Sequence, residues 1–307
     1  MNIAPAIRAH NVLKTFRDTD GSRDTGGNRV TAVDHLDLTI APGEVVAFLG
    51  PNGAGKTTTI DMMLGLSRPD SGEMTVFGMP PRQAARAGRI ASVLQSGGLL
   101  PDYTVAETVR IIASLHGRTA EVDAVMDRAD IAHLANRRVS RCSGGEQQRL
   151  KFALATLPDP DLIILDEPTA GMDVESRRAF WAAMRADARN GRTVVFATHY
   201  LDEADDFADR IVMLAHGRIV ADGSTAQIRN VASRRVVSAI VDEDGLGTLG
   251  RTISDLEVVD RRGGRVYLSS ADSDALARTL LTATCAREIE VATRNLEDAF
   301  VALTSAA

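Results

Sequence analysis

A glycine-rich stretch that ends in a lysine places the strongest constraint on how this chain can fold. Residues 50–57 read Gly-Pro-Asn-Gly-Ala-Gly-Lys-Thr and fit the pattern GxxxxGK[ST]. They follow an apolar strand candidate, Val45 to Gly50, and precede a segment that fits a helix, Thr58 to Leu66. A strand, a glycine-rich loop and a helix in this order predict an α/β fold with a buried parallel sheet.

Such a loop binds phosphate for a physical reason. Glycines let successive backbone N–H groups turn inward around phosphate oxygens, and the amino terminus of the helix adds partial positive charge. Lys56 would reach the β- and γ-phosphates of a nucleoside triphosphate, and Thr57 would coordinate Mg²⁺. The alternative is a glycine-rich turn without a ligand, but the flanking strand and helix favour the phosphate site. The candidate phosphate-binding residues are Gly50, Pro51, Asn52, Gly53, Ala54, Gly55, Lys56, Thr57 and Thr58.

Acidic side chains end a second apolar strand candidate. Residues 162–165 are continuously apolar, and Asp166-Glu167-Pro168 follow directly. Ligands of open α/β sheets bind beyond the carboxyl ends of the strands, so Asp166 is the predicted Mg²⁺ ligand and Glu167 the predicted base for an attacking water. His199 follows the strand candidate Thr193 to Ala197 and could contact the γ-phosphate or the water. Taken alone, such an acidic pair is more often a cap or turn, and a lone histidine is usually structural.

The remaining patterns organise the chain into two domains. Further strand candidates are Ile7 to Phe16, Thr31 to Ile40, Arg89 to Gln95 and Thr193 to His199, and residues 18–28 fit an exposed hairpin loop. Between Gln95 and Ser143 the apolar residues recur every three or four positions, which predicts a helical insertion. From about Arg229 a small α+β domain is expected. Its strands are Val236 to Val241, Glu257 to Asp260, Arg265 to Ser269 and Glu288 to Ala292, and its helices Asp274 to Thr282 and Leu296 to Leu303.

Composition excludes several classes of protein. Apolar residues make up 44% and charged residues 25% of the 307 positions, as in soluble globular proteins. The longest apolar run, Ala179 to Met184, is far shorter than the ~20 residues that span a bilayer, and the amino terminus lacks the apolar core of a secretory signal. We therefore expect a cytoplasmic protein. The two cysteines, Cys142 and Cys285, form no zinc motif, and the net charge of -6 disfavours nucleic acid as a partner.

A third motif carries a resemblance to a known family. Residues 142–147, Cys-Ser-Gly-Gly-Glu-Gln, resemble the LSGGQ sequence of ABC ATPases and precede Asp166 at the spacing found in that family. Ser143 and Glu146 also fit an S-x-x-E capping box at the start of a helix. Both interpretations can hold together, because a capped helix directs backbone donors outward at an anion.

The resemblance implies a fold, a cofactor and partners. The fold is an α/β P-loop NTPase of ABC type, with a mixed sheet core, an antiparallel β subdomain and a helical subdomain at about 96–142. The ABC domain would span 1–229 and a small C-terminal α+β domain 230–307. Mg²⁺ and ATP would be sandwiched in a head-to-tail dimer, expected to be a homodimer, beneath a membrane permease on a separate chain. The subunit would then lie at the cytoplasmic face of the plasma membrane.

The resemblance also assigns roles to individual residues. Ser143, Gly144, Gly145 and Glu146 would serve the γ-phosphate held by the opposite subunit. Phe16 matches the aromatic residue that stacks on adenine, Gln95 the switch glutamine near the metal and the water, Asp173 the D-loop, and His199 the switch histidine. Catalysis would then involve Glu167, His199 and Gln95, and the metal would be held by Thr57, Gln95 and Asp166.

The sequence departs from the family pattern in the third motif. Cys142 replaces the usual leucine and Glu146 the usual glutamine, which brings a carboxylate near a phosphate site. Repulsion is small if Glu146 turns back to its own cap, and closure on ATP is weakened if it does not. Phe16, in place of the commoner tyrosine, keeps the stacking surface but lacks a hydroxyl.

The tail suggests a subtype, and the substrate stays open. Residues 295–300 resemble the C-terminal extension of daunorubicin-resistance-type exporters of drugs and antibiotics; the alternative is an amphipathic helix that closes a small domain. We expect export of a lipophilic drug, antibiotic or lipid, with heme, sodium or polysaccharide as alternatives.

A soluble ABC-type ATPase acting on DNA or ribosomes would carry long coiled coils or two ATPase halves. A regulatory module without hydrolysis would not need Glu167 and His199.

Overall fold

The computed structural model describes residues 4–17, 29–94, 98–189, 191–232 and 235–292. Within the chain two compact units are separated between Thr225 and Ala226, and each is described by itself. Three sequence predictions lie outside the described residues: the loop at 18–28, Gln95, and the tail with its helix at 296–303.

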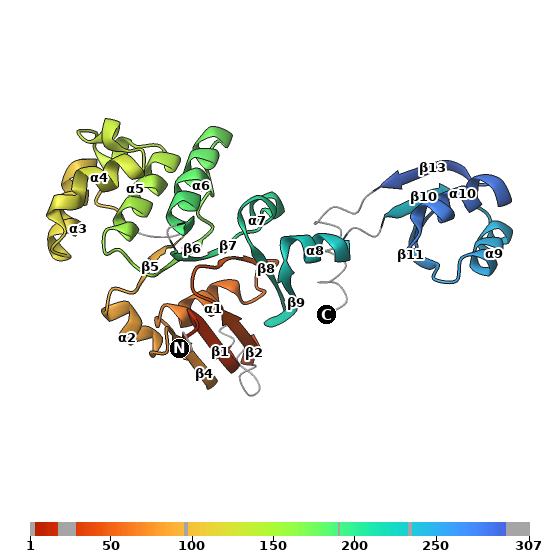
Figure 1. Ribbon diagram of the computed structural model, residues 1–307, viewed down its shortest axis with the longest axis horizontal. Helices are drawn as coiled ribbons and strands as arrows, with labels where there is room; N and C mark the ends of the chain where they lie inside the picture. The colour runs from red at the N-terminus through yellow and green to blue at the C-terminus, as the bar shows by residue number, and fades with distance from the viewer. Residues whose placement is uncertain (1–3, 18–28, 95–97, 190, 233–234, 293–307) are drawn as a thin grey trace, which may run out of the picture. The chain divides into compact units, whose positions relative to one another are not determined.

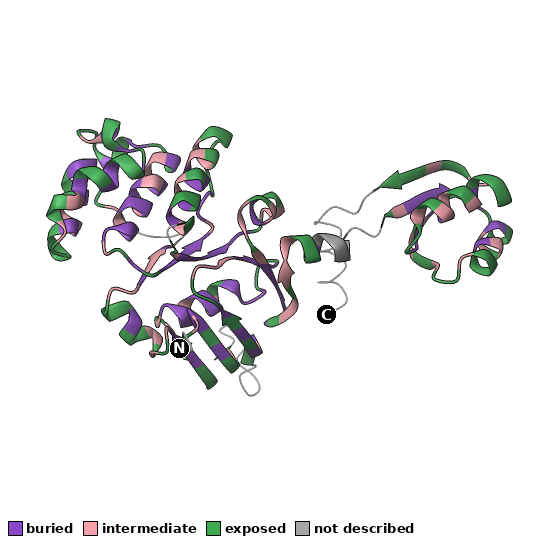
Figure 2. Ribbon diagram, viewed as in Figure 1, coloured by how far each residue is buried: buried purple, intermediate pink, exposed green. Residues whose placement is uncertain are grey.

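A six-stranded sheet forms the centre of the first unit (Figure 1). Its order is β5-β6-β7-β3-β8-β9, and all neighbours are parallel except β8 and β9. Of the short apolar runs that predicted buried strands, β6 and β7 are buried along their whole length, and β3 is buried except at its first residue (Figure 2). The strands are β3 (Val45–Leu49), β5 (Ile90–Val93), β6 (Leu162–Asp166), β7 (Thr193–Ala197), β8 (Arg210–Ala215) and β9 (Arg218–Ser224).

A second, antiparallel sheet packs against the first through one helix. It has the order β2-β1-β4, with β1 at Ile7–Arg17, β2 at Arg29–Ile40 and β4 at Ser71–Val76. Helix α1 (Lys56–Met63) contacts β2 and β4 on one side and β6 on the other. A single apolar core joins both sheets to this helix, with Val12, Phe48 and Ile60 fully buried in it. The helix that follows the glycine-rich loop is therefore fixed between two sheets.

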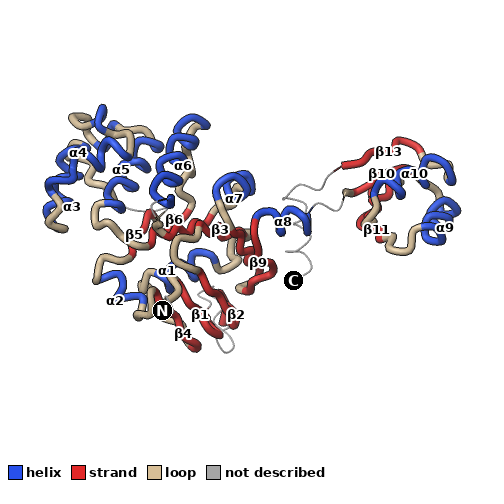
Figure 3. The backbone as a smooth tube through the Cα atoms, viewed as in Figure 1, coloured by secondary structure: helices blue, strands red, loops and turns tan. Residues whose placement is uncertain are grey.

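The predicted helical insertion is confirmed. Its described residues contain α3 (Val105–Leu115), α4 (Val122–Arg128) and short 3₁₀ turns at Thr119–Glu121, Ala132–Leu134 and Val139–Arg141, and α5 (Gly144–Thr156) follows it. Helix α5 contacts α3, α4, β5 and α6 (Val174–Arg189), which joins the insertion to the sheet. Shorter helices are α2 (Pro81–Arg86), α7 (Leu201–Phe207) and α8 (Thr225–Ala232), all visible in Figure 3. None of the helices in the described ranges has the length and apolar character needed to cross a bilayer.

The second unit is a small α+β fold with a four-stranded antiparallel sheet. The strands are β10 (Val236–Ile240), β11 (Glu257–Arg262), β12 (Arg265–Ser269) and β13 (Arg287–Ala292), in the order β11-β12-β10-β13. Helices α9 (Glu243–Thr252) and α10 (Ser273–Ala283) complete a β-α-β-β-α-β chain order. Its own apolar core includes Val237, Leu249, Leu268 and Leu276.

The predicted fold class is correct, and most predicted strands match within a few residues. Strand β5 ends at Val93, earlier than predicted, and β7 ends at Ala197, the shorter of its two predicted limits, so His199 lies in the following loop. Strands β4, β8 and β9 and helices α2 and α9 were not predicted. The helix after the glycine-rich loop begins at Lys56, two residues earlier than expected, so Lys56 and Thr57 belong to its first turn.

Candidate active site

One pocket of about 350 Å³ gathers most of the residues predicted for nucleotide binding. It is lined by the glycine-rich loop, the end of β6 and the paired strands β1 and β2. Phe16 lines the pocket and has 47% of its surface exposed, so its ring is accessible for stacking on a base. The lining residues are Phe16, Val30, Thr31, Ala32, Asn52, Gly53, Ala54, Gly55, Lys56, Thr57, Thr58, Asp166 and Glu167.

Glycines shape the loop because other residues do not fit there. Gly55 has a φ of +98°, and a Cβ at this position would lie 2.2 Å from the carbonyl oxygen of Ala32. A Cβ on Gly50 would lie 2.5 Å from the carbonyl oxygen of Leu214. The loop is thus packed tightly against the neighbouring strands, and its curvature depends on glycine.

Lys56 lies inside the curve of the loop. Its Nζ donates hydrogen bonds to the carbonyl oxygens of Gly50, at 2.5 Å, and Pro51, at 3.1 Å. Burial lowers the pKa of Lys56, although the charges of Glu167 and Asp166 oppose this shift. A triphosphate in the loop would replace the carbonyl oxygens as acceptors and would compensate the buried charge.

Asp166 and Thr57 place two oxygen atoms side by side at the end of β6. Thr57 Oγ1 lies 3.4 Å from Asp166 Oδ2. Burial and the adjacent charge of Glu167 raise the pKa of Asp166, while the hydrogen bond from Thr57 and the charge of Lys56 partly offset this. A hydroxyl and a carboxylate are the hard oxygen ligands that Mg²⁺ prefers, so these residues fit the metal that the sequence predicts.

Glu167 is held against His199 in an unusual backbone conformation. Its φ is +51°, which a side-chain-bearing residue rarely adopts, and its N–H donates to the carbonyl oxygen of Ala197 at 2.9 Å. Glu167 Oε2 lies 2.6 Å from His199 Nδ1. The carboxylate is mostly buried, whereas the imidazole is half exposed. Two of the three predicted catalytic residues are therefore in direct contact, and Glu167 lines the pocket.

The third motif forms the amino terminus of α5 and does not line this pocket. Ser143 is the N-cap, and its hydroxyl accepts from the backbone N–H of Glu146 at 3.3 Å. The Glu146 carboxylate turns back, accepts from the N–H of Ser143 at 2.7 Å and pairs with Arg137 at 2.8 Å. The capping box is thus formed in full. The carboxylate that could have repelled a phosphate is tied to its own cap and to an arginine.

The pKa of Glu146 predicts a pH-dependent contribution to stability. Burial disfavours its charged form, but the hydrogen bond from Ser143 and the charge of Arg137 outweigh burial and leave the pKa below its usual range. A lowered carboxyl pKa stabilises the fold above the unfolded pKa, about 4.3, and this contribution is lost as pH falls through the folded value. Urea unfolding should show Glu146→Gln to be less stable than wild type by about 1 kcal/mol or less at pH 7, and this difference should shrink as pH falls below about 4.3 and through the folded pKa. A difference that grows on acidification would contradict the assignment.

Asp173 has a local role at the start of α6. Both of its carboxylate oxygens accept from Ser176, one from the backbone N–H and one from the hydroxyl, each at 2.8 Å. These hydrogen bonds lower the pKa of Asp173. A Cβ on Gly145 would lie 3.2 Å from the side chain of Ser176, so the tip of α5 and this turn are neighbours. The predicted contact of Asp173 with nucleotide remains a prediction.

Val30, Thr31 and Ala32 line the pocket but were not predicted as site residues. They lie on β2, far from the motifs in sequence, and reach the loop only because β2 pairs with β1. A signal existed, because the predicted strand at 31–40 pairs with the strand that carries Phe16. It did not show which end of the strand would meet the loop.

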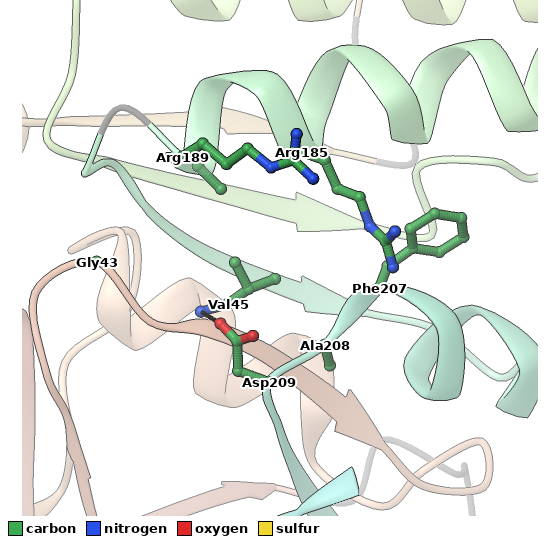
Figure 4. A pocket seen from close by; sticks show the side chains of 8 residues that line it. Gly43, Val45, Arg185, Arg189, Phe207, Ala208 and Asp209 are labelled. Atoms are coloured by element: carbon green, nitrogen blue, oxygen red, sulfur yellow. Dashed lines mark hydrogen bonds between the residues drawn. The ribbon is translucent and has the colours of Figure 1, made fainter.

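A second pocket, of about 340 Å³, lies before the amino ends of β3 and β8 (Figure 4). Arg185 and Arg189 from the end of α6 extend across it, and Arg185 lies over the ring of Phe207 at 4.6 Å. Asp209 accepts there from the N–H of Val45 at 3.2 Å. The pocket contains none of the predicted site residues. Because β3 is parallel to β8, this pocket and the glycine-rich loop lie at opposite ends of β3.

Comparison with known proteins agrees with this geometry. The family described as ABC transporter matches residues 33–170. The Nod factor export ATP-binding protein I of Mesorhizobium japonicum is 33% identical over 94% of this chain and 86% of its own length. The protein of the same name from Burkholderia lata is 32% identical over 99% and 98% of the two chains.

Solved structures show the same fold. An ATP-binding cassette determined as a dimer in a post-hydrolysis state with ADP and Pi superposes with a TM-score of 0.63 at 25% identity, over 71% of this chain and 98% of that one. A bacterial Atm1-family ABC exporter with ATP bound gives a TM-score of 0.62 at 26% identity, over 74% and 40%. With near full-length relatives above 30% identity, the chain belongs to the ABC transporter ATP-binding proteins, and it is an ATPase of that family.

Proposed function

We propose that this chain is the motor subunit of an exporter: two copies close on two Mg·ATP, and hydrolysis reopens them beneath a separate membrane permease. One observation carries the proposal. The pocket joins the phosphate loop to Glu167, which contacts His199 just outside the lining, while the capped tip of α5 does not line the pocket of the same chain. A second chain would bring Ser143 and Gly145 to the γ-phosphate, and the solved cassette described above is a dimer bound to ADP and Pi.

The residues of the pocket divide the work among them. Lys56 and the loop N–H groups bind the phosphates, Phe16 stacks on the base, and Thr57 and Asp166 hold Mg²⁺, with Gln95 as a further ligand. Mg²⁺ would neutralise charge on the phosphate oxygens. Glu167 accepts a proton from the attacking water, and His199 orients that water at the γ-phosphate. Product release then lowers the affinity between the two subunits.

The nature of the cargo is proposed from the relatives and the tail. The two relatives described above are named for export, and their similarity extends over most or all of the chain, including the second unit. We propose a lipophilic cargo, with residues 1–229 as the ATPase domain and 230–307 as an accessory domain. The subunit would lie at the cytoplasmic face of the membrane, held there by its permease.

Reconstitution tests this function. The chain would be expressed together with a candidate permease, purified from membranes and placed in liposomes. We expect co-purification, and we expect lipophilic compounds to raise ATP hydrolysis above its basal rate while heme, sodium and polysaccharide do not. Stimulation by DNA or ribosomes in the absence of any permease would instead identify a soluble machine.

A further inference from the structure

A buried carboxylate outside the pocket links the two segments that carry the catalytic pair. Glu203, on α7, is 2% exposed. One carboxylate oxygen accepts from the hydroxyl of Thr169, and the other accepts from the hydroxyl of Thr198 at 2.8 Å. Thr169 follows Glu167 by two positions, and Thr198 directly precedes His199.

The position of these contacts matters because the sheet restrains the chain only up to this point: the N–H of Thr198 still donates to the carbonyl oxygen of Phe48 on β3 at 3.2 Å. Strand β6 ends at Asp166 and β7 at Ala197, and the last backbone tie between them is the hydrogen bond from Glu167 to Ala197. Beyond that point, Glu203 is the side chain that bonds to both segments among the described contacts. Glu203 thus cross-links the segment after β6 to the segment after β7 just past their last backbone hydrogen bond.

The strain at Glu167 makes such a restraint necessary. A residue with a φ of +51° relaxes toward negative φ unless its surroundings hold it, and this relaxation would turn its side chain away from His199. The 2.6 Å contact between the two side chains also needs the loop of His199 to stay in place. There the hydroxyl of Thr198 accepts from the N–H of Tyr200 at 3.0 Å, which makes a tight turn at His199.

An arginine extends the cluster to the first turn of α6. Arg177 Nε lies 3.5 Å from Glu203 Oε1, and its guanidinium lies over the ring of Tyr200 at 4.9 Å. The same ring contacts His199, with 4.0 Å between the ring centres. The helix that follows Asp173 is thus connected to both sides of the catalytic pair through Glu203 and Tyr200.

We propose that Glu203 is a positioning residue that holds Glu167 and His199 in their productive contact, an inference that rests on the proposed role of Glu167 as the base. Its carboxylate is buried and is not part of the pocket lining. It fixes the separation between the segment after β6 and the segment after β7. Without it the strained Glu167 loses the support that keeps its carboxylate against His199.

Kinetics of Glu203 variants test the proposal. Glu203→Ala should lower kcat by about 10²-fold, since a misplacement of about 1 Å can have that effect, and KM for ATP should change less than about twofold. Glu203→Gln keeps one acceptor and should lose less, which a general loss of folding would not reproduce. Thr198→Val, which removes one hydroxyl at nearly constant volume, should show the same separation of kcat from KM.

Asp187→Asn is the matched control. Asp187 is equally buried, lies on α6 and pairs with Arg192 and Arg128, remote from the pocket lining. It should lower the thermal stability without lowering kcat per folded molecule. If Asp187→Asn and Glu203→Gln reduce kcat equally at equal loss of stability, the positioning role is overturned.

Two further measurements separate this inference from the function itself. In a His199→Ala background, Glu203→Ala should cause almost no additional loss, because residues that act as one unit are not additive. A crystal structure of Glu203→Gln or Glu203→Ala should show Glu167 and His199 apart, and an unchanged contact would refute the proposal even if the chain hydrolysed no ATP. Absence of ATP hydrolysis in the wild type would refute the proposed function alone.

Discussion

A Glu167→Gln variant is expected to bind ATP as wild type does and to hydrolyse it at least about 10²-fold more slowly, because general bases contribute about 10²–10⁴-fold. The amide keeps the size of the side chain and can still contact His199, but it cannot accept the proton of the attacking water. Single-turnover hydrolysis and equilibrium binding of labelled ATP measure the two effects separately. With turnover blocked, closed dimers should accumulate on gel filtration in the presence of Mg·ATP.

Glu175, further along the chain, provides the control for this variant. It is an exposed acidic residue in the first turn of α6 and does not line the pocket, so Glu175→Gln should hydrolyse ATP at the wild-type rate. Wild-type hydrolysis in Glu167→Gln would remove Glu167 from the role of base. In that case the pair with His199 would have to be explained as structural.

Sequence patterns predicted most strands of both units but missed β4, β8 and β9. Strand β4 begins Ser-Gly-Glu, which reads as a turn, and it becomes a strand because it pairs with β1. Helix α9 contains three glycines, at 245, 247 and 250, which lower helix propensity, and the N-cap Asp242 and packing on the second core compensate. Strand β8 was missed although residues 211–215 form an apolar run of the kind that marked the other strands.

The glycine-rich loop and the acidic pair could be located from the sequence, because each is a short local pattern at the end of a strand. The glycine-rich loop, the acidic pair and His199 needed only a strand and a turn to be recognised. Pairing between distant segments could not be read from the chain, so the contributions of Ala32 and Glu203 were not predicted. Glu203 carries no local signal, and its importance appears only when Thr169 and Thr198 are seen on either side of it.

The structure also resolves a question that the third motif left open. A carboxylate at position 146 could point toward a phosphate or toward its own helix, and the sequence fitted both. The hydrogen bond to the N–H of Ser143 and the pair with Arg137 show the second arrangement. The backbone donors at the tip of α5 therefore need not compete with a negative charge directed at the same anion.

Replacement of Lys56 by alanine is expected to weaken ATP binding by roughly 10–150-fold, because hydrogen bonds to charged groups contribute about 1.5–3 kcal/mol. Lys56 is the one lysine in the pocket lining, and its buried charge is held at present by two carbonyl oxygens of the loop. Without it, the β- and γ-phosphates would lose their direct cationic partner on the protein. Titration of a fluorescent ATP analogue without turnover measures the change in Kd.

Lys151→Ala is the matched control for this experiment. Burial lowers the pKa of Lys151 as it does that of Lys56, but Lys151 lies on α5 and outside the pocket. Both Lys56→Ala and Lys151→Ala should therefore change the stability of the fold, but only Lys56→Ala should lower the affinity for ATP. Lys56→Met, which keeps the apolar stem, should bind ATP as weakly as Lys56→Ala, since the missing group is the charge. Wild-type affinity in both Lys56 variants would show that the loop binds phosphate through its backbone alone.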